Sequence, residues 1–180
     1  MKISKILQWN CKSIKQRHED LKDLIGNENP DCICLQETRL KGNTQSIRGF
    51  TIHTQTPYDC DRAGGGVLIA IKNGIDHRRI PLQTTLQVAA VELIASDVKA
   101  IASIYLPPQK HIGKDEITNI ISQLPEPFML LGDYNAHHGL WYNSGEDSRG
   151  KMIKSVLMEN NLICLNDHRP TYYMTRLPQT

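Results

Sequence analysis

The sequence predicts a layered α/β domain in which β-sheet lies inside and helices lie outside. Short apolar runs typical of strands outnumber the stretches with helical spacing, and the helical stretches fall between strands that read as buried on both faces. No repeat, low-complexity tract or linker divides the 180 residues. Because this length corresponds to one domain, we predict a single domain over residues 1–180.

The strands are predicted from apolar runs bounded by glycine, proline or polar residues. In chain order these runs are Ile3–Asn10, Asp31–Glu37, Gly49–Thr54, Val67–Lys72, Leu86–Ala95, Lys99–Leu106, Phe128–Leu131 and Leu162–Leu165. Apolar residues spaced three and four apart predict helices over Arg17–Gly26, with Gly26 as the stop, and over Ile112–Leu124. Asp147 or Ser148 is expected to cap a last helix that continues to about Asn160.

Composition limits the possible settings of the protein. Lys and Arg total 21 against 19 Asp and Glu, and this balance neither demands nor excludes a polyanionic partner. A membrane span needs about 18 consecutive apolar residues, and no apolar run approaches this length. Near the N-terminus, the polar Gln8 interrupts any apolar core of a signal peptide. The five cysteines form no CxxC pair, which argues against zinc, and Cys32 and Cys34 read as buried thiols. We therefore expect an intracellular protein with no membrane partner.

Oxygen-bearing residues follow three of the buried-looking strands. Asn10, Glu37 and Asp133 stand at strand ends, and Asn135 shares a face with Asp133 if the chain stays extended past Gly132. Ligands bind at the carboxyl edge of strands in open α/β sheets. Two carboxylates and two amides there would suit Mg²⁺ or Mn²⁺. The alternative is that these residues merely form turns, which favour Asn and Asp.

Five motifs occur in an order that resembles a known family. They are Gln8-Trp9-Asn10-Cys11, Leu35-Gln36-Glu37-Thr38, Gly64-Gly65-Gly66-Val67, Ile104-Tyr105-Leu106-Pro107-Pro108 and Gly132-Asp133-Tyr134-Asn135-Ala136-His137. Together they resemble the endonuclease/exonuclease/phosphatase superfamily, the fold of apurinic endonucleases and of the type I DNase. More narrowly, they look like the endonuclease domain of non-LTR retrotransposons, near the jockey-like elements.

The resemblance implies a fold and a set of roles. The fold would be a four-layered α/β sandwich of the DNase I-like type, with two packed mixed sheets flanked by helices. Glu37 would bind the metal, with Asn10 beside it on the metal or the phosphate. Asp133 would deprotonate the attacking water, Asn135 would hold Asp133 or the phosphate, and Tyr105 would contact the phosphate. The cofactor would be Mg²⁺ or Mn²⁺ and the substrate DNA.

Further residues carry weaker expectations. Tyr105 could instead be a half-buried aromatic at a strand end. The glycines before Val67 lack the Lys-Ser/Thr of a phosphate-binding P-loop and are expected to form a tight strand entry. Arg62, with Arg39 and Lys41, could contact the DNA backbone, although solvated surface charge is the alternative for each. His137 is a candidate substrate contact, with a structural loop histidine as its alternative.

The sequence also departs from the family pattern. At Lys12 many members carry a small polar or acidic residue that assists the metal, and a lysine would not ligate. Neither the metal carboxylate of a later strand nor the terminal Ser-Asp-His motif occurs, and the segment containing His168 matches a region just before the missing part. The resemblance therefore implies a domain that is incomplete at its C-terminus and lacks its last strands.

These features support one function and leave others open. The favoured reading is a Mg²⁺-dependent endonuclease domain that nicks target DNA to prime reverse transcription, with activity impaired in this chain. It would be fused in a parent polyprotein to a reverse transcriptase and act in the nucleus. The alternatives are an inactive fragment that binds nucleic acid or metal, and a DNA-repair endonuclease or phosphoesterase of the same superfamily. Target specificity and oligomeric state stay open.

Overall fold

The computed structural model describes residues 3–40, 46–55, 65–141 and 145–166. These residues belong to two compact units, Met1–Tyr134 and Asn135–Thr180. The first unit contains two four-stranded sheets and two helices, and the second contains a 3₁₀ helix, Gly139–Trp141, and the helix α3, Ser148–Glu159.

Each sheet combines one parallel strand pair with antiparallel neighbours. The first sheet has the order β1 (Ile6–Asn10), β2 (Cys32–Gln36), β4 (Val67–Lys72) and β3 (Phe50–Gln55), and the second has the order β5 (His77–Arg79), β6 (Gln87–Leu93), β7 (Ala100–Tyr105) and β8 (Phe128–Asp133). Only β1–β2 and β7–β8 are parallel among these pairs. In register, Asn10 lies opposite Gln36 and Tyr105 lies opposite Asp133, so the carboxyl ends of each parallel pair coincide.

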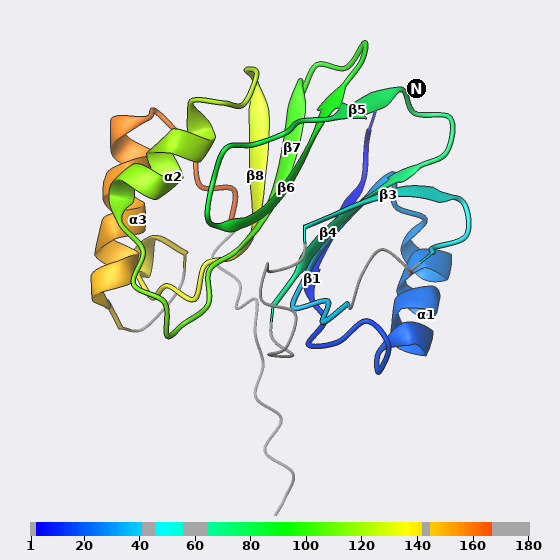
Figure 1. Ribbon diagram of the computed structural model, residues 1–180, viewed down its shortest axis with the longest axis horizontal. Coiled ribbons are helices and arrows are strands. Elements are labelled where there is room, and N and C mark those ends of the chain that lie inside the picture. Colours follow the sequence, from blue (N-terminus) through cyan, green and yellow to red (C-terminus); the bar gives the residue numbers. More distant parts are fainter. Residues whose placement is uncertain (1–2, 41–45, 56–64, 142–144, 167–180) are drawn as a thin grey trace, which may run out of the picture. The chain divides into compact units, whose positions relative to one another are not determined.

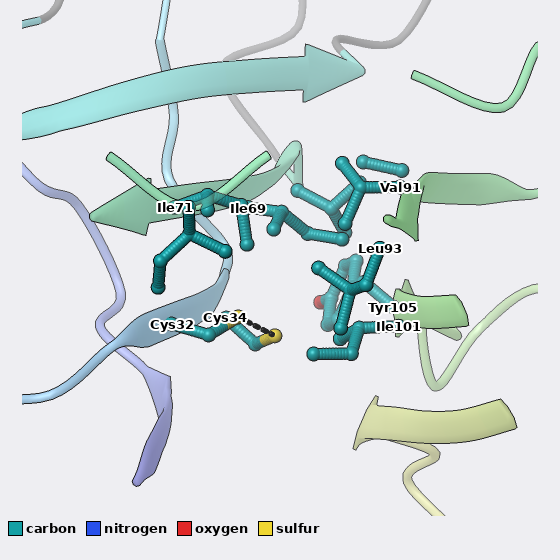
Figure 2. Packing of buried hydrophobic residues seen from close by; sticks show 11 residues of the cluster. Cys32, Cys34, Ile69, Ile71, Val91, Leu93, Ile101 and Tyr105 are labelled. Carbon is teal, nitrogen blue, oxygen red and sulfur yellow. Dashed lines mark hydrogen bonds between the residues drawn. The ribbon is translucent and has the colours of Figure 1, made fainter. Parts of the chain in front are cut away.

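The two sheets pack face to face over an apolar core (Figure 1). Figure 2 shows side chains of the two sheets pointing toward one another, with Cys32 and Cys34 of β2 on one side and Leu93 and Ile101 on the other. Alternate residues of β2 point the opposite way, because successive strand side chains face opposite sides of a sheet. Those residues, Ile33 and Leu35 among them, join a second buried cluster.

Helices cover the outer faces of the first unit. The helix α1, His18–Glu28, buries Leu21 in the second cluster, against the face of the first sheet that points away from the core. The helix α2, Lys114–Ile121, lies on the other side of the two sheets (Figure 1) and buries its isoleucines, at positions 117, 120 and 121. The order helix, sheet, sheet, helix confirms the predicted four-layered α/β sandwich.

Most predicted elements occur within a few residues of their expected bounds, and three details differ. The predicted stop at Gly26 is wrong, because α1 continues to Glu28 and ends at Asn29, which adopts a left-handed conformation. The predicted strand Leu162–Leu165 is also wrong, since this segment pairs with no strand among the described residues and Ile163 is 83% exposed. The short strand β5 carries no apolar run and was not predicted.

The cap of the last helix follows the prediction. Asp147 is the N-cap of α3, and its side chain accepts a hydrogen bond of 2.6 Å from the backbone N–H of Gly150. Within the described residues, none of the helices is long and apolar enough to cross a membrane.

Candidate active site

Four of the residues predicted for the site lie together at one end of the two-sheet sandwich. Asn10 is the last residue of β1 and Glu37 directly follows β2, while Tyr105 and Asp133 are the last residues of β7 and β8. The two parallel pairs bring these ends together within each sheet, and face-to-face packing brings the two sheets together. The site is therefore shared between the sheets.

Asn10 connects the two halves of the site. Its amide nitrogen donates hydrogen bonds to the carboxylates of Glu37, at 2.8 Å, and Asp133, at 2.5 Å. Its amide oxygen accepts a hydrogen bond of 3.2 Å from the backbone N–H of Lys12. Because the oxygen is held by the backbone, the NH₂ group faces the two carboxylates.

Glu37 leaves the strand in an unusual backbone conformation. Its φ is +50°, and that of Arg39 is also +50°, a left-handed region that residues other than glycine rarely adopt and that is enriched at functional sites. The guanidinium of Arg39 lies 3.2 Å from the Glu37 carboxylate, whose side chain is 16% exposed. The structure thus places Arg39, a candidate DNA contact, directly against the predicted metal ligand.

Tyr105 faces both carboxylates from the second sheet. Burial is the largest cause that raises its pKa, to about 12, and the negative charges of Glu37 and Asp133 and a hydrogen bond to Glu37 add to it. The phenol therefore stays protonated near neutral pH and acts as a hydrogen-bond donor. Since the residue is 7% exposed and its phenol is hydrogen-bonded to Glu37, the alternative of a strand-end aromatic with its hydroxyl in water does not fit.

The glycines before β4 form the tight strand entry that the sequence predicted. Gly65 and Gly66 have φ of +86° and +89°. Their carbonyl groups accept hydrogen bonds from the backbone N–H groups of Arg39 and Thr38, at 2.9 and 3.2 Å. The backbone N–H of Gly66 donates to the side chain of Gln87 at 2.5 Å. These bonds tie the segment after Glu37 to the start of β4.

Other predicted residues belong to the second unit or lie outside the described residues. Asn135 begins the second unit with φ of +46°, so the extended geometry that would place it on the face of Asp133 does not continue, and its role stays a prediction. His137 contacts Asp147, the cap of α3, at 2.8 Å. This contact fits the structural alternative, and a substrate contact of His137 stays a prediction. Arg62, Lys41, Gly64 and His168 lie outside the described residues.

The neighbouring His138 is fixed by its surroundings. It is 6% exposed, its Nδ1 accepts a hydrogen bond of 3.0 Å from the backbone N–H of Leu140, and its Nε2 lies 3.2 Å from Glu146. In the neutral ring, Nε2–H is then the donor to the carboxylate. Both ring nitrogens have partners within the second unit, which indicates a structural role.

The ligands available for a cation are hard oxygens. Within the described ranges, no group of three or more His, Cys, Asp or Glu side chains could hold a metal ion. Mg²⁺ does not require such a cage, because it keeps several waters and binds through one or two carboxylates. The carboxylates of Glu37 and Asp133 fit that mode of binding and fit poorly to zinc. The Asn10 oxygen, the atom that would bind a cation, accepts the backbone N–H of Lys12 here.

Comparison with known proteins places the chain in a family. The model of the Endonuclease/Exonuclease/phosphatase family matches residues 7–179. The match covers almost the whole chain, and the two-sheet fold with oxygen-bearing residues at one end agrees with it. The chain belongs to the endonuclease/exonuclease/phosphatase family.

Individual relatives point to mobile elements. The chain is 29% identical over 174 residues to the RNA-directed DNA polymerase from mobile element jockey of Drosophila melanogaster, covering 94% of this chain and 19% of that protein. Among solved structures, the endonuclease domain of TRAS1, a telomere-specific non-LTR retrotransposon, has a TM-score of 0.78 at 22% identity and covers 92% of this chain and 76% of that chain. The 3′ phosphatase NExo from Neisseria, bound to a product DNA hairpin, has a TM-score of 0.65 at 16% identity, over 86% of this chain and 70% of that chain. These two structures establish the fold, and the chain spans about a fifth of the jockey protein.

Proposed function

We propose that this chain is an endonuclease domain of a non-LTR retrotransposon that hydrolyses phosphodiester bonds of DNA with Mg²⁺ or Mn²⁺. The observation that carries the proposal is the contact of the Asn10 amide with both Glu37 and Asp133. This contact brings two carboxylates with different predicted roles within reach of one phosphate group. Family membership and the likeness to the TRAS1 endonuclease domain support a nuclease.

The carboxylates have separate tasks in this mechanism. Glu37 would hold the cation, and when bound the cation polarises a phosphoryl oxygen and stabilises the leaving oxygen. Asp133 accepts a proton from the attacking water, a step that typically contributes about 10²–10⁴-fold to the rate. Asn10 keeps the two carboxylates apart, and its NH₂ group can donate a hydrogen bond to a phosphate oxygen. Binding of the cation would use its amide oxygen, which accepts the Lys12 backbone N–H in this structure.

Neutral and cationic groups complete the proposed site. Tyr105 is protonated and donates a hydrogen bond to a phosphate oxygen as negative charge builds there. Asn135 would hold Asp133 or the phosphate. Arg39 carries positive charge beside the site, where it can contact a phosphate group of the DNA backbone. Arg62 and His137 are proposed as further substrate contacts.

The relatives support a proposed biological setting. The jockey relative is an RNA-directed DNA polymerase, and this chain matches only 19% of it. We place the domain in a larger protein that also carries a reverse transcriptase, whose priming requires a nick in chromosomal DNA. The parent element would then act in the nucleus.

The proposal is tested by a nicking assay on supercoiled plasmid. The purified chain is assayed with Mg²⁺, with Mn²⁺ and with EDTA, and the Asp133→Asn variant is compared with Asp23→Asn. Asp23 is exposed on α1, so its variant controls for loss of one negative charge. We expect metal-dependent nicking that Asp133→Asn lowers by about 10²-fold or more and that Asp23→Asn leaves unchanged.

The same assay distinguishes the alternatives. Nicking that is unaffected by Asp133→Asn removes Asp133 from the mechanism. A folded chain that binds DNA without cleaving it favours the inactive fragment. Preference for an abasic oligonucleotide or a 3′-phosphate over intact plasmid favours a repair endonuclease or a phosphoesterase.

A further inference from the structure

A buried glutamine and a serine join the two sheets just behind the site. Gln36 and Ser103 have no exposed surface, and the side-chain nitrogen of Gln36 donates a hydrogen bond of 2.9 Å to the hydroxyl of Ser103. The Gln36 oxygen accepts a hydrogen bond of 2.7 Å from the side-chain nitrogen of Gln8. Gln36 belongs to β2 and Ser103 to β7, so the bond crosses from one sheet to the other.

We call the hydrogen bond between Gln36 and Ser103 the bridge. In the strand register it lies close to Asn10, Glu37, Tyr105 and Asp133. Gln36 directly precedes Glu37 and pairs in register with Asn10. Ser103 lies two residues before Tyr105 on the same face of β7, and it pairs with Leu131, two residues before Asp133. The bridge therefore lies one layer of side chains behind the site.

The two polar groups lie beside an apolar core. The positions that precede Gln36 on the same face of β2 are Cys32 and Cys34, which pack in the apolar cluster between the sheets. A buried amide costs free energy unless it is hydrogen-bonded, and apolar contacts alone are not directional. A hydrogen bond fixes the distance between its two partners, so this pair can hold the sheets at a defined separation.

A second polar contact crosses the sheets nearby. Gln87 lies opposite Tyr105 on β6, and its side-chain oxygen accepts the hydrogen bond from Gly66, at the entry to β4. A side chain at Gly65 would displace the Gln87 amide, and the φ of +86° at this position favours glycine. The segment after Glu37 is thus also tied to the strand next to Tyr105.

We propose that Gln36 and Ser103 are positioning residues of the nuclease site, because their hydrogen bond sets the distance between the half on the first sheet, Asn10 and Glu37, and the half on the second, Tyr105 and Asp133. This inference rests on the proposed function. The bridge contacts no substrate and acts through the residues at the strand ends.

The test compares single and double substitutions of the pair. Gln36→Met leaves the Ser103 hydroxyl without its partner, Ser103→Ala leaves the Gln36 nitrogen without its partner, and each single variant should melt at a lower temperature than the parent. The double variant removes both polar groups and should recover much of that loss, since replacing both partners with apolar groups is nearly neutral. Gln8 is exposed and can bond to water.

In the double variant, we expect the melting temperature to recover while kcat stays low. A displacement of about 1 Å costs about 10²-fold in rate, so we expect kcat for plasmid nicking to fall roughly 10- to 100-fold in all three variants, with KM unchanged. The proposal is overturned if kcat returns to the parent value in the double variant together with the melting temperature.

A second readout does not depend on nuclease activity. Hydrogen exchange follows the backbone N–H groups of Cys11 and Leu106, which donate to the carbonyl groups of Gln36 and Asp133 at the ends of the two parallel strand pairs. Loss of the bridge should loosen these strand ends and speed the exchange of both N–H groups in the double variant. Ile101→Val, in the same core and strand, is the matched control and should leave both the exchange and kcat unchanged.

The two readouts separate failure of the bridge from failure of the proposed function. If the parent chain does not nick DNA under any condition, the proposed function fails and hydrogen exchange at Cys11 and Leu106 alone decides on the bridge. Unchanged exchange at both positions in the double variant would then show that the bridge does not position the strand ends.

Discussion

The side-chain amide of Asn10 donates a 2.5 Å hydrogen bond to the carboxylate of Asp133, which lies 123 positions later in the sequence and on the other sheet. The same nitrogen also contacts Glu37. A neutral donor thus separates two acidic groups that would otherwise repel each other at neutral pH.

Replacement of Asn10 with a carboxylate should make folding depend on a cation. Asn10→Asp removes the donor and adds a third negative charge beside Glu37 and Asp133. We expect a lower melting temperature in EDTA and a larger rise on addition of Mg²⁺ than the parent shows, because a ligand stabilises the state that binds it. Thermal melts with and without Mg²⁺ measure both effects. Gln109→Glu adds the same charge at an exposed turn and should show neither; equal Mg²⁺ responses in all three proteins would contradict the prediction.

The raised pKa of Tyr105 predicts that the protein loses stability at alkaline pH. Its folded-state pKa of about 12 exceeds the about 10 of an unfolded tyrosine. The contribution of Tyr105 is therefore complete below about pH 10 and is lost as the pH rises toward 12. Urea unfolding at pH 9, 10 and 11 should show a steeper decline for the parent than for Tyr105→Phe. Parallel curves would mean that Tyr105 titrates alike in the folded and unfolded chain.

A histidine pair predicts the opposite dependence at acidic pH. The Nε2 atoms of His53 on β3 and His77 on β5 lie 2.9 Å apart, and the Nδ1 of His77 contacts the Ile75 carbonyl at 2.8 Å. The neutral His77 ring therefore donates from Nδ1 and accepts from His53 at Nε2. Burial first, and then the charges of His77 and Arg79, lower the pKa of His53.

The resulting stability is present above about pH 6.5, the unfolded value, and is lost as the pH falls through the lower folded pKa. We expect the free energy of unfolding to decline between pH 7 and pH 5 in the parent and to decline less in His53→Gln. His111→Gln, at an exposed position, should retain the decline of the parent. A parent whose stability is constant over this range would contradict the assignment.

Gly132 is required by the close contact of β7 and β8. A side chain there would collide with the carbonyl group of Ile104, its partner in the strand register. Gly132→Ala should cost about 1–3 kcal/mol of stability and should reduce nicking, since Asp133 is the next residue. Gly26→Ala, on α1, is the control substitution. A methyl group at Gly26 would meet no neighbouring atom, so alanine should stabilise the helix by about 0.5–1 kcal/mol. Chemical denaturation of both variants tests the difference.

The ends of strands were more predictable from the sequence than the segments after them. Asn10, Glu37 and Asp133 could be placed at one edge because apolar runs mark the strands and parallel strands end together. Asn135 could not be placed in the same way, because the chain turns into a left-handed conformation after β8 and alternation of faces no longer applies. The strand expected at Leu162–Leu165 is absent because an apolar run alone does not supply a pairing partner.

The bridge between the sheets was not predictable from local pattern. Gln36 ends an apolar run and reads as an ordinary polar strand end, while Ser103 is a small residue inside another run. Their contact spans 67 positions and depends on how two sheets stack, a relation that no local periodicity encodes. Arg39 is a similar case: its charge was noted, but its contact with Glu37 depends on the left-handed conformations of these two residues in the segment after β2.

The division of the site between two sheets has a consequence for the timing of activity during synthesis. A chain emerging from the ribosome completes β1 and β2 long before β8, so Asn10 and Glu37 are in place while Asp133 has not yet been made. In the proposed mechanism, a partly synthesised or half-folded domain would therefore hold no base beside its metal ligand. Nicking of DNA would then require the closed sandwich, and a nicking assay would also report completed folding.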